Sequence, residues 1–121
     1  MKVAITSQGK DLAAPVDERF GRCRYFIIAD TESGSFTALE NAGAMASGGA
    51  GIQAAQALAD RGVEAVITGY MGPKAMQTLQ AAGIKVYAGA SGSVGEALAM
   101  FKEGKLGLID RANVNAHFGM R

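Results

Sequence analysis

The sequence predicts an α/β domain in three layers (α/β/α), with a mixed five-stranded sheet between helices. A strand hairpin occupies the first third of the chain, and helices alternate with strands in the rest. Gly62, Gly83 and Gly104 recur at a constant spacing, and each follows a helical segment where a left-handed glycine ends helices. Such a repeat is typical of parallel βαβ units. With 121 residues and a hydrophobic fraction of 49%, the chain can form one such domain with a core.

The first part of the chain contains three predicted strands. Residues 3–6 are a short apolar run, typical of a buried central strand. Residues 25–29 are aromatic and β-branched, which is the strongest strand signal in the sequence. Turn residues at 31–34 join this run to the alternating segment 35–40, so the two are expected to form an antiparallel hairpin.

The middle of the chain predicts two helix–strand units. A loop rich in Gly, Ala and Ser at 41–51 opens the first helix, and strands are expected at 63–68 and 84–87. The buried face of the first helix is predicted to consist of Ile52, Ala55, Leu58 and Ala59.

The last helix has the clearest start signal. Ser93 and Glu96 have the spacing of a capping box, in which each side chain bonds the other's backbone N–H. We assign residues 1–109 to the domain. The polar residues 110–121 show no periodicity and are interpreted as a flexible C-terminal tail.

Composition excludes several classes of function. The chain has 12 basic and 11 acidic residues, so nucleic acid and anionic membranes are not expected partners. One Cys and one His cannot form an internal disulfide or a four-ligand zinc site. No targeting segment or membrane span is visible, and we expect a cytoplasmic protein with a reduced thiol.

Glycine-rich segments follow the predicted parallel strands, at the carboxyl edge where open α/β sheets bind ligands. One comprises Gly69, Tyr70, Met71 and Gly72, and a helix opens at Gly48, Gly49 and Gly51. Small residues expose backbone N–H groups and leave room, and N–H groups at helix starts favour anions. The alternative is that these glycines only turn the chain and allow close packing.

Candidates for catalysis or direct metal ligation are few. Cys23 lies between Arg22 and Arg24, and these cations favour a thiolate that could ligate metal or react, although a Cys packed beside the strand is the alternative. His117 is a candidate ligand or a solvated tail residue. Residues 49–54 match a dinucleotide fingerprint without its usual strand context, so a nucleotide-binding regulatory module remains an alternative, as does an enzyme that uses Cys23.

Several segments together resemble the dinitrogenase iron–molybdenum cofactor-binding family. They are MKVAIT at the start, Pro15-Val16 leading to Phe20-Gly21-Arg22, Tyr25-Phe26, GGAG at 48–51 and GVEAVITGYMGPKAMQTLQAAGIKVYAG at 62–89. The resemblance runs from Met1 to about Gly104. It implies a ribonuclease-H-like fold with sheet order 3-2-1-4-5 and one antiparallel strand. The chain is similar in size to the stand-alone members, which include a carrier of a molybdenum–copper sulfide cluster.

The resemblance also implies a function without catalysis on an organic substrate. A preassembled molybdenum–copper sulfide cluster would be bound or carried, with an iron–molybdenum or iron–sulfur cofactor as the alternative. Protein partners in cluster delivery, or a multiprotein complex, are implied. Nitrogenase-associated members carry a His directly before the Phe-Gly pair as the suspected ligand, whereas this chain has Arg19 there.

Clusters of the thiomolybdate type are polyanions whose metals are already coordinated by sulfide. We therefore expect non-covalent contacts from arginines, backbone N–H groups and apolar side chains. The predicted cluster-binding residues are Arg22, Cys23, Arg24, Gly48, Gly49, Gly51, Gly69, Tyr70, Met71 and Gly72. Cys23 and His117 are the candidates for a direct bond to metal.

Overall fold

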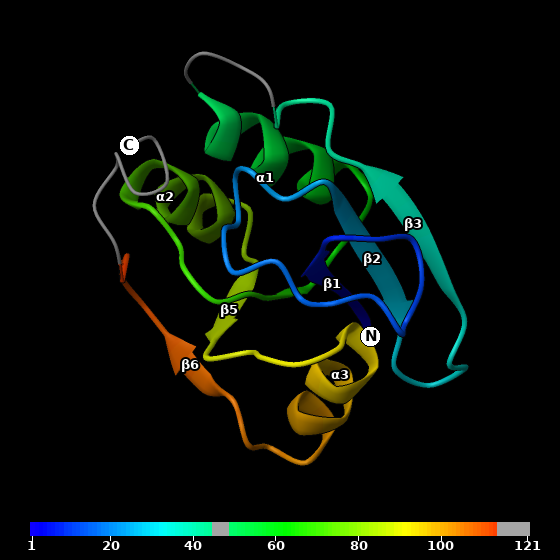
Figure 1. Cartoon of the computed structure of the whole chain (residues 1–121). Coiled ribbons are helices and arrows are strands. Elements are labelled where there is room, and N and C mark those ends of the chain that lie inside the picture. The colour runs from blue at the N-terminus through cyan, green and yellow to red at the C-terminus, as the bar shows by residue number, and fades with distance from the viewer. Residues whose placement is uncertain (45–48, 114–121) are drawn as a thin grey trace.

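The computed structural model describes residues 1–44 and 49–113 (Figure 1). The elements in chain order are β1 (Lys2–Ser7), β2 (Tyr25–Asp30), β3 (Phe36–Glu40), α1 (Ala50–Asp60), β4 (Ala65–Ile67), α2 (Pro73–Ala81), β5 (Lys85–Ala88), α3 (Val94–Lys102) and β6 (Gly107–Ile109).

These strands form one mixed sheet in the order β3-β2-β1-β4-β5-β6. Strands β1, β4 and β5 are parallel, and β2 runs antiparallel between β1 and β3. The predicted order 3-2-1-4-5 is confirmed, and the sheet has a sixth strand beyond the predicted five. Strand β6 pairs antiparallel with β5 through only three residues, which is too short for a periodic signal in the sequence.

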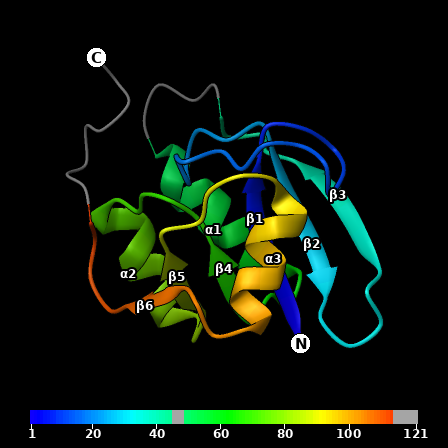
Figure 2. The ribbon, with the colours of Figure 1, turned by 60° about the horizontal axis from the view of Figure 1, so that its bottom comes forward.

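Helices cover both faces of the sheet (Figures 1 and 2). Helices α1 and α2 contribute to the core on one face together with Ala4 and Phe26, whereas α3 packs with Val3, Ile5 and Ile27 on the other. Successive residues of β1 and β2 alternate between the two cores, as the pleat of a strand requires. The three-layer prediction is therefore confirmed.

Local chemistry sets the helix ends as predicted. Gly62, Gly83 and Gly104 all have positive φ, between 72° and 75°, and each lies two positions after the last residue of α1, α2 or α3. At the start of α3, Ser93 Oγ accepts from the Glu96 N–H at 3.1 Å, and the Glu96 carboxylate accepts from the Ser93 N–H at 3.0 Å. This capping box holds the pKa of Glu96 below its ordinary value.

The buried face of α1 differs from the prediction. Ile52 is 39% exposed, and the buried residues are Ala50, Ala54, Ala55 and Leu58. The reason is the close approach of α2: a Cβ on Gly51 would lie 3.0 Å from the Cβ of Ala75. Only very small side chains fit between the starts of the two helices, so the larger Ile52 is turned outward.

The first residues of the predicted tail are attached to the domain. Gln80 Nε2 of α2 donates to the Asp110 carbonyl at 2.7 Å, and Asn113 bonds the β4–α2 loop. Residues 110 and 113 thus have hydrogen-bond partners distant in sequence, while the flexibility of the tail stays a prediction. Within the described ranges, no helix is long and apolar enough to cross a membrane.

Candidate anion-binding site

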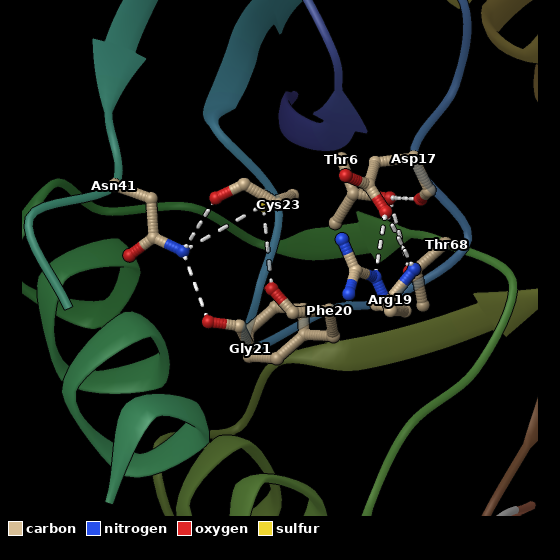
Figure 3. Close-up of polar contacts among 8 residues, drawn as sticks. All are labelled: Thr6, Asp17, Arg19, Phe20, Gly21, Cys23, Asn41 and Thr68. Carbon is tan, nitrogen blue, oxygen red and sulfur yellow. Dashed lines mark hydrogen bonds and ion pairs between the residues drawn. The ribbon is translucent and has the colours of Figure 1, made fainter. Parts of the chain in front are cut away.

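The chain covers the carboxyl ends of β1 and β4 with its own β1–β2 loop. Thr6 Oγ1 donates to the Asp17 carbonyl at 2.5 Å and lies 3.0 Å from Thr68 Oγ1 (Figure 3). Both threonines are fully buried. The space directly beyond these strands, where the sequence led us to expect a ligand, is therefore filled by protein.

The same loop is joined to the β4–α2 loop. The Tyr70 N–H donates to the Glu18 carbonyl at 2.6 Å, and the Phe20 N–H donates to the Tyr70 carbonyl at 3.2 Å. A Cβ on Gly69 would lie 2.9 Å from the Glu18 carbonyl oxygen, so a side chain at 69 would separate the loops. Close packing therefore accounts for Gly69, as the alternative interpretation proposed.

The start of α3 is already satisfied by the protein. Besides the capping box, the Val94 N–H donates to the Ala14 carbonyl at 2.9 Å and the Gly95 N–H to the Leu12 carbonyl at 2.8 Å. An anion would have to displace these acceptors, so this helix start is a poor binding site.

Unlike the start of α3, the starts of α1 and α2 have no side-chain cap from the described residues. Helix α1 is preceded by Gly49 and α2 by Gly72, and neither first turn is acidic. The close contact of Gly51 with Ala75 places the two starts side by side. Two positive helix ends converge there, which is an arrangement that attracts anions. We call Gly49, Gly51, Gly72 and the loop residues Arg22 and Tyr70 beside them the α1–α2 edge.

Arg22 and Arg24 lie in different surroundings. Arg22 Nη1 donates to the Ala44 carbonyl at 2.9 Å, and a Cβ on the preceding Gly21 would lie 3.0 Å from the backbone of Gly51. Arg22 therefore belongs to the α1–α2 edge. The Arg24 guanidinium lies 5.7 Å from the centroid of the Tyr25 ring, which by strand alternation points to the α3 face.

Cys23 is part of the core and is fully buried. Its thiol donates to the Phe20 carbonyl at 3.3 Å, and the Asn41 amide that bonds the Cys23 carbonyl at 2.9 Å also lies 3.8 Å from the sulfur (Figure 3). Burial, reinforced by the Asp17 carboxylate, raises the pKa of Cys23 to about 12. The structure thus favours the packed, protonated Cys over the thiolate that two adjacent arginines suggested.

Of the remaining predicted site residues, some are accessible to a ligand and one is buried in the core. Tyr70 is 36% exposed, and a Cβ on Gly72 would meet nothing within 4 Å, so both are accessible. The Met71 side chain is fully buried in the core, so it cannot supply an apolar contact to a cluster, and its place among the predicted cluster-binding residues is not supported for the side chain. Gly48 and His117 lie outside the described residues. Within those residues, no three His, Cys, Asp or Glu side chains gather to hold a metal ion.

Sequence reasoning missed Asp17 and Asn113. The buried Asp17 carboxylate accepts from the Arg19 N–H at 3.0 Å and lies 3.6 Å from Arg19 Nε (Figure 3). A parallel bridge joins Arg19 to Tyr70, so this second arginine lies beside the α1–α2 edge. The Asp-x-Arg spacing was a signal for Asp17, whereas nothing in the sequence distinguishes Asn113.

These features describe an α/β fold with a candidate anion-binding edge, and its described residues include no group of three His, Cys, Asp or Glu side chains that could hold a metal ion. A family model described as dinitrogenase iron-molybdenum cofactor matches residues 1–104, and the chain belongs to this family.

Two solved structures and one relative matched by sequence agree with this assignment. The apo form of the orange protein from Desulfovibrio gigas is 41% identical, with a TM-score of 0.91 over 93% of this chain and 96% of that one. TM1290 of Thermotoga, a member of the DUF35 family, is 43% identical, with a TM-score of 0.80 over 93% and 97%. The uncharacterized protein MJ0580 of Methanocaldococcus jannaschii is 35% identical over 78% of this chain and 87% of its own length.

Proposed function

We propose that this protein binds and carries a preassembled metal–sulfur cluster on the α1–α2 edge, without transforming an organic substrate. The observation that carries the proposal is the pair of adjacent helix starts, without side-chain caps from the described residues or acidic first turns, beside Arg22. Membership of the cofactor-binding family supports the class of ligand.

The site suits a cluster that brings its own ligands. Within the described residues the chain offers no group of metal-binding side chains, and its thiol is buried and protonated. A thiomolybdate-type polyanion needs none, because sulfide already fills the coordination of its metals. We therefore propose the molybdenum–copper sulfide type, with an iron–molybdenum or iron–sulfur cofactor as the alternative.

The binding energy can come from charge-assisted hydrogen bonds. The backbone N–H groups of the first turns of α1 and α2, together with Arg22 and Arg19, would face sulfide atoms, and the Tyr70 ring would add an apolar contact. Each charge-assisted bond contributes about 1.5–3 kcal/mol, so a handful suffices for a Kd of about 1 μM.

The direct test is reconstitution of the full-length protein. Apo-protein is incubated with tetrathiomolybdate and a copper salt, desalted, and analysed for visible absorption and for Mo and Cu per chain. We expect a coloured protein with stoichiometric Mo and Cu. A colourless eluate from a protein that binds ATP or NAD tightly would instead support the nucleotide-binding alternative and overturn the proposal.

Copper and iron distinguish the two kinds of cluster. Protein purified from its own host would carry Mo with Cu under the proposal, and Fe with or without Mo under the alternative.

Protein partners for delivery of the cluster are part of the proposal, since a carrier must receive the cluster from one protein and release it to another.

A further inference from the structure

One residue close to the C-terminus is bonded to the proposed site. Asn113 Oδ1 accepts from the Met71 N–H at 2.6 Å, its Nδ2 donates to the Gly69 carbonyl at 3.0 Å, and its own N–H donates to the Met71 carbonyl at 3.1 Å. These three hydrogen bonds join positions 42 to 44 residues apart. Asn113 thus hydrogen-bonds backbone N–H and carbonyl groups of residues 69–71, as a neighbouring β-strand would.

The opposite side of that stretch is held by the β1–β2 loop. The N–H and carbonyl of Tyr70 bond to Glu18 and Phe20, respectively, so residues 69–71 are hydrogen-bonded on both sides. Helix α2 begins two positions after Met71, at Pro73. The position of this stretch therefore decides where α2 starts relative to α1.

We propose that Asn113 is a positioning residue of the α1–α2 edge, an inference that rests on the proposed function. A carboxamide supplies an acceptor to one backbone group and a donor to another, which an alanine cannot do. With alanine at 113, the Met71 N–H and the Gly69 carbonyl lose their side-chain partners, and only the backbone bond from residue 113 to the Met71 carbonyl remains on that side. Asn113 is uncharged, so its effect on anion binding acts through the placement of Tyr70 and the start of α2.

The test compares Asn113→Ala with Gln80→Ala in the full-length chain. Gln80 binds the same segment through the Asp110 carbonyl, three residues before Asn113, and its hydrogen bond there leaves the bonds of Asn113 to residues 69–71 in place. Each protein is titrated with tetrathiomolybdate, alone and with Cu(I), at two salt concentrations, and exchange of the Met71 amide proton is followed by NMR. Thermal unfolding checks that each variant is folded.

We expect Asn113→Ala to raise the Kd about ten-fold, as the loss of one to two net hydrogen bonds implies. The salt dependence of binding should stay that of the unmodified protein, because no charge is removed. Met71 amide exchange should become fast. Gln80→Ala should change the Kd by less than about two-fold, because the contacts of Asn113 with residues 69–71 remain.

Three outcomes would overturn the inference while leaving the proposed function intact: an unchanged or lower Kd for Asn113→Ala, equal losses in the two variants, or a Met71 amide that the ligand deprotects in the unmodified protein. The last measurement needs no variant, and it would mean that the ligand displaces Asn113. Absence of binding by the unmodified protein would overturn the proposed function, and this inference with it.

Discussion

At the scale of single residues, neighbours in sequence have unlike surroundings. Arg22, Cys23 and Arg24 are consecutive, yet the first lies against the start of α1, the second is in the core, and the third stacks on Tyr25. A loop that leads into a strand turns successive side chains in different directions. Their roles therefore follow from packing and not from proximity in sequence.

Arg22→Ala should weaken cluster binding, and Arg24→Ala is its matched control. Both remove one positive charge from the same loop, but only Arg22 belongs to the α1–α2 edge. Loss of a charge-assisted contact of about 1.5–3 kcal/mol raises the Kd at least ten-fold. The measurement is Mo retained per chain after desalting, together with a titration. Equal effects of the two substitutions would mean that only the general charge of the loop matters.

The buried thiol predicts a dependence of stability on alkaline pH. The folded protein raises the pKa of Cys23 from 9.0 to about 12, so the folded state holds this proton more tightly than the unfolded state. The resulting stabilisation is complete below pH 9 and is lost as the pH rises toward 12, by about 1.4 kcal/mol per pH unit.

Urea unfolding of the unmodified protein and of Cys23→Ala at several pH values measures this loss. The stability difference between the two should shrink by about 2 kcal/mol from pH 9 to 10.5. Parallel curves across that range would show that the thiol is not protected in the folded state. Because Cys23 is not expected to ligate the cluster, Cys23→Ala should also retain stoichiometric Mo.

At the scale of elements, the closeness of α1 and α2 makes the site. Gly51→Ala would place a Cβ 3.0 Å from the Cβ of Ala75 and force the two helix starts apart. Overpacking of this kind costs about 1–3 kcal/mol of stability, and the misplaced N–H groups should lower cluster affinity as well. Thermal unfolding and a tetrathiomolybdate titration measure the two effects.

Two control substitutions separate the loss of stability from the loss of cluster affinity. Ser93→Ala removes the cap of α3, which lies away from the α1–α2 edge, and should cost about 1 kcal/mol of stability without changing affinity. Gly72→Ala meets no neighbour and has φ −77°, so it should unfold like the unmodified protein. A Gly51→Ala protein with normal affinity would show that the spacing of the helices does not determine binding.

At the scale of the whole molecule, ligand binding and folding are linked. The α1–α2 edge exists only when the β1–β2 loop, both helices and residues 69–71 are in place, so an unfolded chain has no equivalent site. A ligand that binds only the folded state stabilises it by about 2.7 kcal/mol at a concentration of 100 times its Kd.

Tetrathiomolybdate should therefore raise the unfolding temperature by several degrees, increasingly with its concentration, and added salt should reduce the rise because it screens the charges. Differential scanning fluorimetry with molybdate as the control anion measures this. An equal rise with molybdate would argue for unspecific anion binding in place of recognition of a sulfide cluster.

The sequence by itself determined most of the architecture. The glycines at 62, 83 and 104, the capping box at Ser93 and the hairpin turn at 31–34 act through bonds within a few residues, so their outcome can be read before the chain folds. It also indicated the edge of the sheet that carries the candidate site, because connections that follow parallel strands all emerge there.

Only the tertiary structure decided which groups at that edge remain available. In the folded chain, carbonyls of the β1–β2 loop accept hydrogen bonds from the N–H groups at the start of α3. The side chains of Cys23 and Met71 are buried in the core, and Asn113 hydrogen-bonds residues 69–71. Burial and hydrogen bonding between distant residues depend on how layers pack, and no local pattern encodes them. The sequence thus determined where ligands can approach, and packing decided which atoms meet them.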